Sequence, residues 1–404
     1  MGGMSVAADR GLGTGLGRVS RRALLAGLVG TPVMLRNSAA AGAPPPLVGT
    51  TPNDELALID PLTREPLAGP RLSLARRWAL LVSADRRHVL MRTYYEMPFR
   101  ISTAETTTLH ESRSFLEGVS SVKGAVIAWP VGPRMMIAKD EDLGGDAVAT
   151  SLEIRNPLTG KVATHKQLYR HMAGGVSGRR GVVLVLAPLR PEPGDASLVI
   201  VDWHGGVRTI PLPGFAVDFV HGSRQPLATL ALSPNQTSVL IGSSHSLIGI
   251  TLKTGRIRRL RPTGDPIEQL AWLTAGAAVA VTRHAWNSPT RVVLLDLGSL
   301  RRRVVGETAG VVALIADRVA FASSTGGLTT FSATGDLLGH AAGTDSLMLS
   351  VPSSSPFVMA VPKAEDLGPG RRVVVDARTG ALVLDQEFDR APSYLTPIAG
   401  RGYD

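Results

Sequence analysis

TLALSPNQTSVLIGSSHSLIGITLKTGRIRRL, residues 229–260, holds four short apolar stretches separated by three polar turns. Ser233-Pro234-Asn235-Gln236 forms the first turn, and Lys253-Thr254-Gly255 forms the last. Side chains of Asn, Asp and Ser bond to their own turn, and glycine accepts a positive φ that other residues resist. Apolar runs bounded by such turns predict strands. The stretch therefore predicts two hairpins, which make one four-stranded sheet.

The second hairpin of this stretch recurs along the chain. Its clear instances are LALIDPLTREPL (56–67), SLEIRNPLTGKV (151–162), LVIVDWHGGVRTI (198–210), LIGITLKTGRIRRL (247–260), VVLLDLGSLRRRVV (292–305), LTTFSATGDLL (328–338) and RVVVDARTGALVL (372–384), and FRISTAETTTL (99–109) is a weaker one without the glycine. We align the repeats on one residue of each turn, here called its anchor. The anchors are Asp60, Thr103, Asn156, Asp202, Thr251, Asp296, Ser332 and Asp376. The spacing is roughly 45 residues, within the range of propeller blades.

This period predicts an all-β fold, a β-propeller built from four-stranded antiparallel blades. Another hairpin lies between consecutive repeats, as in ALLVSADRRHVLMR (79–92), so each period supplies four strands. Eight blades are expected, with seven as the alternative if one weak unit is spurious. Because a propeller ring must close, the first hairpin, with Leu47–Thr51, is expected to pair with a last strand near Tyr394–Ile398.

The turns also resemble those of the WD40-like and YVTN-type β-propellers. Ser233-Pro234-Asn235-Gln236 and Ser83-Ala84-Asp85-Arg86 are similar to the Ser-Pro-Asp-Gly turn of that superfamily, and Asp376, Thr379 and Gly380 match its Asp-x-x-Thr-Gly turn. The resemblance covers nearly the whole chain after the leader. It implies an architecture and not an activity, because these turns occur in propellers of unrelated function.

An export signal begins the chain. Arg21 and Arg22 precede the apolar segment Ala23–Leu35, and small residues up to Ala41 follow. The apolar part is short of the ~20 residues that span a bilayer, and the run from Ser20 to Ala26 resembles a bacterial twin-arginine leader. We therefore expect a signal peptide at 1–41, a Pro-rich segment at 42–54 and one propeller domain at 55–404. Cleavage after Ala41 would release a secreted or extracytoplasmic protein without a transmembrane segment; an uncleaved leader is the alternative.

Composition narrows the possible partners. The net charge is +10, yet the leader holds several of the arginines and the remaining basic residues are scattered. Aromatic residues make up only 4% of the chain, so no platform for stacking bases is expected and nucleic acid is excluded as a partner. With no cysteine, the chain has neither disulfides nor thiolate metal sites.

Ligands are expected on the face that carries the longer connections, those from strand two to strand three and from blade to blade. Candidate residues on that face are Arg283, His284, Trp286, His171, His221, His245 and His340. Converging imidazoles would bind a transition metal, whereas separate ones would simply be solvated. Asp140, Asp142 and Asp146 offer oxygen ligands for calcium, although a solvated hairpin explains them equally. Trp272 lies inside an apolar run and is expected to be core.

Two functions remain open from the sequence. The first is a non-catalytic binding or scaffold propeller that presents its loop-rich face to a protein or a cell-envelope polymer, with no cofactor. The second is a propeller enzyme, a lactonase, lyase or metal-dependent oxidoreductase, with its pocket at the mouth of the central channel. Linear signatures of nucleophile, zinc or phosphate sites are absent from the sequence, which favours the first.

Overall fold

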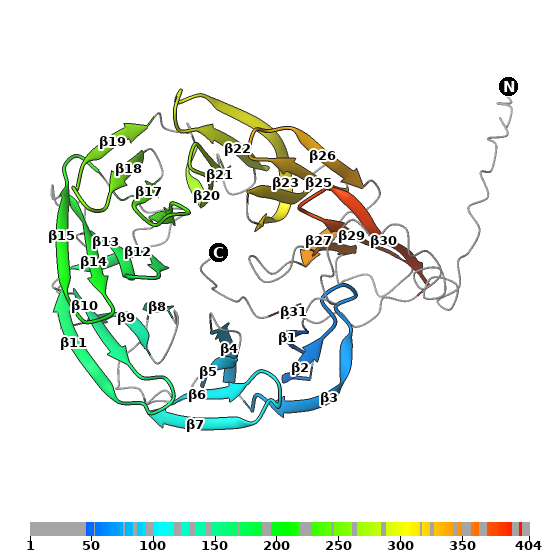
Figure 1. Ribbon diagram of the computed structural model, residues 1–404, viewed down its shortest axis with the longest axis horizontal. Helices are drawn as coiled ribbons and strands as arrows, with labels where there is room; N and C mark the ends of the chain where they lie inside the picture. The colour runs from blue at the N-terminus through cyan, green and yellow to red at the C-terminus, as the bar shows by residue number, and fades with distance from the viewer. Residues whose placement is uncertain are drawn as a thin grey trace, which may run out of the picture. The chain divides into compact units, whose positions relative to one another are not determined.

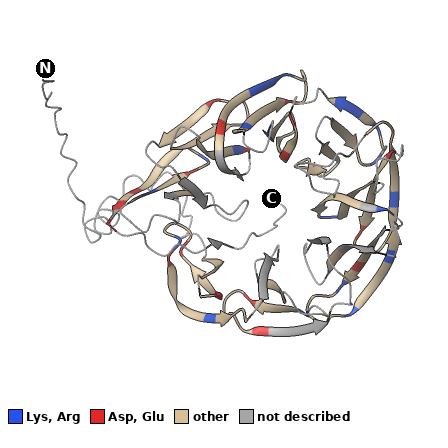
Figure 2. Ribbon diagram, turned by 180° about the vertical axis from the view of Figure 1, so that it is seen from behind, with Lys and Arg blue, Asp and Glu red and all other residues tan. Residues whose placement is uncertain are grey.

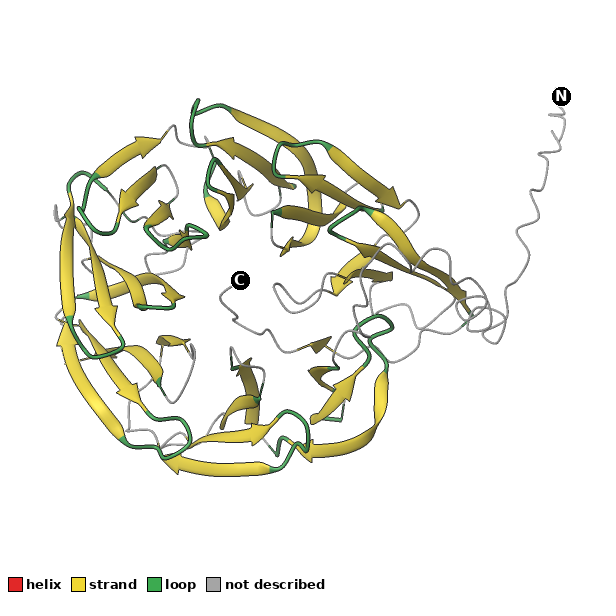
Figure 3. Cartoon of the chain, in the orientation of Figure 1, coloured by secondary structure: helices red, strands yellow, loops and turns green. Residues whose placement is uncertain are grey.

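Strands make up all the regular structure that the computed structural model of the chain describes (Figure 3). The described residues are 46–51, 53–75, 77–83, 87–93, 100–116, 123–128, 134–142, 148–168, 170–187, 195–215, 217, 228–243, 246–260, 265–283, 288–315, 317–323, 327–341, 346–349, 357–362, 370–389 and 396–397. All lie in the second of two units into which the chain divides, Met1–Pro45 and Pro46–Asp404. Among them no helix is long and apolar enough to cross a membrane.

The described strands form six antiparallel four-stranded sheets and one seven-stranded sheet, β20 (Ile267–Thr274) to β26 (Leu337–Ala341), in which two successive blades share the strand β23 (Arg302–Ile315). Counted this way they make eight blades, here called blades 1 to 8 in chain order (Figure 1). Blades 1 to 4 contain, in order from strand one to strand four, β31 Thr396–Pro397, β1 Leu47–Thr50, β2 Glu55–Ile59 and β3 Pro66–Ser73; β4 Arg77–Val82, β5 His88–Thr93, β6 Arg100–Glu105 and β7 Glu111–Leu116; β8 Lys123–Ala128, β9 Met135–Asp142, β10 Val148–Arg155 and β11 Val162–Leu168; and β12 His171–Gly178, β13 Gly181–Ala187, β14 Ala196–Asp202 and β15 Val207–Leu212. Blades 5 to 8 contain β16 Thr229–Leu232, β17 Ser238–Gly242, β18 Leu247–Thr251 and β19 Ile257–Leu260; β20 Ile267–Thr274, β21 Ala277–Arg283, β22 Thr290–Asp296 and the first part of β23 Arg302–Ile315; the end of β23, β24 Arg318–Ser323, β25 Leu328–Ser332 and β26 Leu337–Ala341; and β27 Ser346–Leu349, β28 Phe357–Pro362, β29 Gly370–Asp376 and β30 Ala381–Phe388.

The eight-blade expectation is confirmed. Blades 6 and 7 share β23, whose first part pairs with β22 and whose end pairs with β24. A C-terminal strand completes blade 1, because β31 pairs with β1 through Gly49 to Pro397 and Thr50 to Thr396. The predicted pairing of an N-terminal and a C-terminal strand in one sheet is thereby observed.

Each of the eight anchored turns contains one residue in the left-handed region shortly after its anchor. Six of them place the fourth residue after the anchor in the left-handed region, with φ between 49° and 74°, and two place the third residue there. The anchor expected at Thr103 is wrong, because Thr103 is buried within β6. Glu105 takes its place: its carbonyl accepts the N–H of Leu109 at 2.9 Å, as Asp60 accepts that of Arg64. The weak repeat lacks glycine because Leu109 itself adopts φ 49°.

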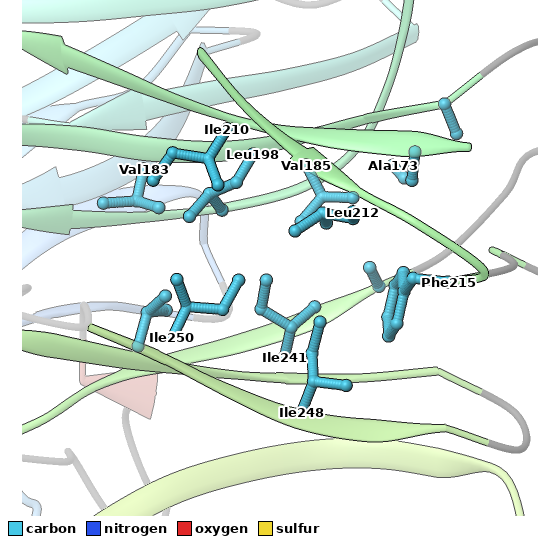
Figure 4. Close-up of a cluster of buried hydrophobic side chains, with 14 residues drawn as sticks. Ala173, Val183, Val185, Leu198, Ile210, Leu212, Phe215, Ile241, Ile248 and Ile250 are labelled. Carbon is cyan, nitrogen blue, oxygen red and sulfur yellow. The ribbon is translucent and has the colours of Figure 1, made fainter. Parts of the chain in front are cut away.

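The core lies between consecutive blades. Residues of a strand alternate, so that in β14 Leu198 faces blade 5 and Val199 faces blade 3. Figure 4 shows the interface between blades 4 and 5, where Leu198 of blade 4 lies opposite Ile241 and Ile248 of blade 5. Burial of such apolar side chains on both faces of every blade is the main stabilising term of a fold without disulfides.

Arginines also join consecutive blades. Five of them donate from one blade to backbone carbonyl oxygens in the anchored turn of the next: Arg134 to Trp203, Arg208 to Leu252 and Lys253, Arg258 to Leu297 and Gly298, Arg318 to Arg378, and Arg372 to Thr63. The distances run from 2.7 to 3.3 Å. These five belong to the basic residues that Figure 2 colours blue on the blades, and their contacts link one blade to the next.

Two buried arginines mark the contact between blades 8 and 1. Arg64, fully buried in the anchored turn of blade 1, donates to the carbonyl oxygen of Phe357 at 3.0 Å. Burial lowers the pKa of Arg64 to about 10, although the nearby Asp60 carboxylate opposes this. From blade 8, Arg372 donates to Thr63 and lies 3.3 Å from Glu65. The first and last blades are thus linked by charged hydrogen bonds in addition to the strand pairing.

Candidate functional site

Several residues predicted for the loop-rich face lie outside the described part of the chain. They are His221, His245, His284, Trp286 and Asp146. Arg283, the last residue of β21, is described: its Nε lies 3.0 Å from Glu268 and donates to the Thr290 hydroxyl at 3.1 Å. Arg283 is therefore bound to the neighbouring strands β20 and β22 of its own blade.

The sequence predicted that His171 and His340 lie in connections between strands. The structure places both of them in strands. His171 begins β12, the first strand of blade 4. His340 lies on β26, the last strand of blade 7, where its exposed ring has Nδ1 3.0 Å from the Thr329 hydroxyl. The two histidines thus lie on strands of blades 4 and 7, which are not neighbours along the chain.

The acidic candidates also differ from expectation. Asp140 and Asp142 belong to β9, where they pair with Thr150 and Val148 of β10, so the hairpin begins later than predicted. The apolar pattern ends before them, but backbone pairing continues, because ladder hydrogen bonds need no particular side chain. Among the described residues, no group of three or more His, Asp and Glu side chains is placed to hold a metal ion.

A hollow of about 650 Å³ lies between blades 5 and 6, near their anchored turns. We call it the 5–6 hollow. Its apolar side chains are those of Leu240, Leu260, Trp272 and Leu297, which belong to or pack against the cluster between blades 5 and 6. Ile250 and Ile257 also border it, although their side chains pack in the cluster between blades 4 and 5. Its polar side chains are those of Ser238, Thr251, Arg256 and Arg258. This volume is within the range of small-ligand and side-chain pockets. A smaller hollow of about 180 Å³, beside Phe215, lies between blades 4 and 5.

Gly249 explains why the 5–6 hollow exists. It lies two residues before the anchor, at a position whose side chain faces the next blade, and blades 4 and 6 carry Ile200 and Leu294 there. A Cβ added to Gly249 would meet only Leu240, at an ordinary 3.6 Å. The space that Ile200 occupies between blades 4 and 5 is therefore left open between blades 5 and 6.

Trp272 of β20 forms one wall of the hollow and is half-buried, not full core as predicted. It packs against the apolar cluster between blades 5 and 6. Its indole Nε1 is buried, and no hydrogen-bond partner for it occurs in the described structure. Trp203 of blade 4, by contrast, donates its indole N–H to the carbonyl oxygen of Gly178 at 3.2 Å. A buried donor without an acceptor is costly, which marks Trp272 as a group suited to a ligand.

Two arginines of blade 5, Arg256 and Arg258, line the hollow, and no acidic side chain is among the described residues that line it. Arg259 lies on the other side of blade 5, where it lines the smaller hollow and donates to the Pro213 carbonyl oxygen. On the side of blade 6, the Asp296 carboxylate accepts hydrogen bonds from Gly298 and Ser299, and chiefly the Ser299 hydroxyl holds the pKa of Asp296 below its usual value. Asp296 therefore keeps its negative charge, but it is not among the residues that line the hollow, whose charged side chains are Arg256 and Arg258. The lining thus favours an acidic ligand.

Sequence reasoning missed this site because it placed ligands on the opposite face. A signal was nevertheless present: LIGIT of blade 5 has glycine where LVIVD and VVLLD of the neighbouring blades have isoleucine and leucine. A glycine at a buried strand position can mark a close approach or a gap.

The comparisons with known proteins agree with the fold. No protein-family model matches the chain, and no curated protein matches it. Among solved structures, the dihydro-heme d1 dehydrogenase NirN in complex with DHE is similar with a TM-score of 0.57 and 13% identity, over 87% of this chain and 75% of that one. A eukaryotic initiation factor has a TM-score of 0.52 and 13% identity, over 89% of this chain and 92% of that one. Saccharomyces cerevisiae Sqt1 has a TM-score of 0.50 and 14% identity, over 85% of this chain and 95% of that one.

These similar structures are β-propeller-type proteins. Their low identities show the fold alone. Together with the eight antiparallel blades, they confirm the predicted β-propeller.

Proposed function

We propose that this chain is a secreted, non-catalytic β-propeller that binds a protein or a cell-envelope polymer. Export by the twin-arginine route is part of the proposal and rests on Arg21, Arg22 and the small residues up to Ala41. A rigid propeller without disulfides suits a route that carries folded proteins. The role of the loop-rich face also rests on the sequence, because most of its connections lie outside the described residues.

The chemistry of the 5–6 hollow is the observation that carries the proposal. Its polar side chains are two hydroxyls and two guanidiniums. Arginine stays protonated throughout the physiological range, and general acid–base catalysis needs a group that exchanges its proton near the working pH. The hollow therefore has the means to hold a ligand by apolar contact, hydrogen bonding and charge, without the groups that would convert it.

The test is cosedimentation of the purified mature protein with envelopes of the cell that produces it. We expect binding to intact envelopes, and treatment of the envelopes with protease beforehand decides whether the partner is protein or polymer. No binding to either preparation contradicts the proposal. Stoichiometric transition metal in the purified protein, lost on His221→Ala or His284→Ala substitution, would support the enzyme alternative instead.

A further inference from the structure

We infer that the 5–6 hollow binds an acidic peptide segment of a partner protein, with one apolar side chain of that segment inserted between blades 5 and 6. This inference rests on the proposed function and narrows it, since it chooses a protein over a polymer. Three features of the hollow lead to it: its apolar depth, its buried indole donor and its basic rim.

The depth of the hollow is suited to an apolar side chain. Gly249 leaves open the space that Ile200 fills in the preceding interface, and Leu240, Leu260 and Leu297 surround it. Filling such a space with an aliphatic or aromatic group removes apolar surface from water on both partners. A side chain of the partner would thus take the place that Ile200 has between blades 4 and 5.

The indole of Trp272 selects the kind of molecule that carries this apolar group. Its buried Nε1 has no acceptor among the described residues, so a good ligand places an oxygen beside the apolar group. A peptide does this at every residue through its carbonyl groups. The tail of an acyl chain provides no acceptor, and a polysaccharide provides acceptors but no aliphatic side chain to fill the depth.

The rim sets the charge of the segment. Arg256 and Arg258 of blade 5 line the hollow, and the described residues that line it include no acidic side chain. The guanidinium of Arg258 is already bound to the carbonyl oxygens of Leu297 and Gly298, and Arg256 is exposed at the hollow. Carboxylates flanking the apolar residue would meet this positive potential, which raises the rate of encounter and the specificity.

The inference is tested with three synthetic pentapeptides, acetylated and amidated: DDLDD, KKLKK and DDSDD. The readout is the set of indole N–H signals in a two-dimensional NMR spectrum, in which Trp272→Phe identifies the signal of Trp272. We expect DDLDD to shift that signal in a saturable way and the other two peptides to bind at least about tenfold more weakly, because each lacks one of the recognised features.

Two variants complete the test. Gly249→Ile fills the hollow and is expected to weaken DDLDD binding at least about tenfold without loss of folding. Trp203→Phe, which removes the other buried indole of this region, serves as the matched control and leaves binding unchanged. The inference is wrong if the Trp272 signal does not move at millimolar DDLDD, if KKLKK binds equally well, or if Gly249→Ile binds as the parent does.

The remaining outcomes separate this inference from the proposed function. A shift of the Trp272 signal by dodecyl phosphate below its micelle concentration, without one by DDLDD, would identify an anionic amphiphile as the ligand and overturn the inference. Envelope binding that Gly249→Ile leaves intact would overturn the inference while the proposed function stands. Loss of envelope binding in the parent protein overturns the proposed function whatever the peptides do.

Discussion

The interface between blades 4 and 5 and the interface between blades 5 and 6 are built from the same repeat, yet the first has a hollow of about 180 Å³ and the second one of about 650 Å³. In the first, Ile200 packs against a cluster of buried apolar side chains. Trp203 of the same blade 4, which packs on the other side of that blade against blade 3, donates its indole N–H to the Gly178 carbonyl oxygen. In the second, Gly249 stands at the equivalent position, and the buried indole nitrogen of Trp272 has no hydrogen-bond partner among the described residues. A single position of the repeat thus changes a structural interface into one with room for a ligand.

The difference separates what the repeat must keep from what it can vary. Turn anchors, strand pairing and the arginines that reach the next turn occur at both interfaces. The residue two positions before the anchor differs between them, isoleucine at 200 and glycine at 249, and it takes no part in the turn. Loss of that side chain removes packing locally and leaves the ladder of the sheet intact.

Two single substitutions, Ile200→Gly and Gly249→Ile, are expected to give the largest difference in the free energy of unfolding. Ile200→Gly removes a packed aliphatic side chain and adds backbone freedom in a strand, so the free energy of unfolding is expected to fall by about 3 kcal/mol. Gly249→Ile fills existing space and restricts the unfolded chain, and it is expected to raise the free energy of unfolding by about 1 kcal/mol. Urea unfolding of both variants and the parent measures the two changes.

A matching loss in both variants would break the comparison. Gly249→Ile that destabilises the protein as much as Ile200→Gly does would mean that the 5–6 hollow closes around its neighbours in solution and has no room for a side chain.

The two tryptophans give a smaller and sharper difference. Trp203→Phe removes the donor to the Gly178 carbonyl and is expected to cost about 1–2 kcal/mol of unfolding free energy. Trp272→Phe breaks no hydrogen bond within the described chain, so we expect a change below about 0.5 kcal/mol. Thermal unfolding compared at one protein concentration is sufficient. Equal losses would show that Trp272 has an internal acceptor and would remove one of the three features that define the site.

The sequence predicted the parts of the fold that repeat and missed those that depend on a neighbour. Anchors such as Asp60 and Asp376 reveal their turns because a carboxylate, three residues and a glycine-like conformation recur in one short stretch. Leu109 concealed the turn of blade 2, because a non-glycine residue adopts the left-handed conformation there.

The candidate site was harder to predict for a physical reason. His340 was expected in a connection, but the outer strand β26 extends over it, and strand ends depend on pairing that side chains do not encode. To predict the 5–6 hollow, one has to know that Gly249 of blade 5 and Trp272 of blade 6, which are 23 residues apart, line the same space. A single sequence shows the missing side chain but not the wall opposite it.

The arginines that span the two interfaces should give the smallest difference. Arg208 and Arg258 each donate to two carbonyl oxygens in the anchored turn of the next blade, at 2.8–3.3 Å, and both are exposed. Methionine keeps most of the aliphatic stem and removes the donors, so Arg208→Met and Arg258→Met are each expected to cost about 1 kcal/mol of unfolding free energy in urea. The two losses should be equal, because both contacts lie at the turns and neither depends on the residue at position 200 or 249. A much larger loss for Arg258→Met would show that this arginine compensates for the missing side chain of Gly249. The interface between blades 5 and 6 would then be stabilised mainly by the hydrogen bonds of Arg258 to Leu297 and Gly298.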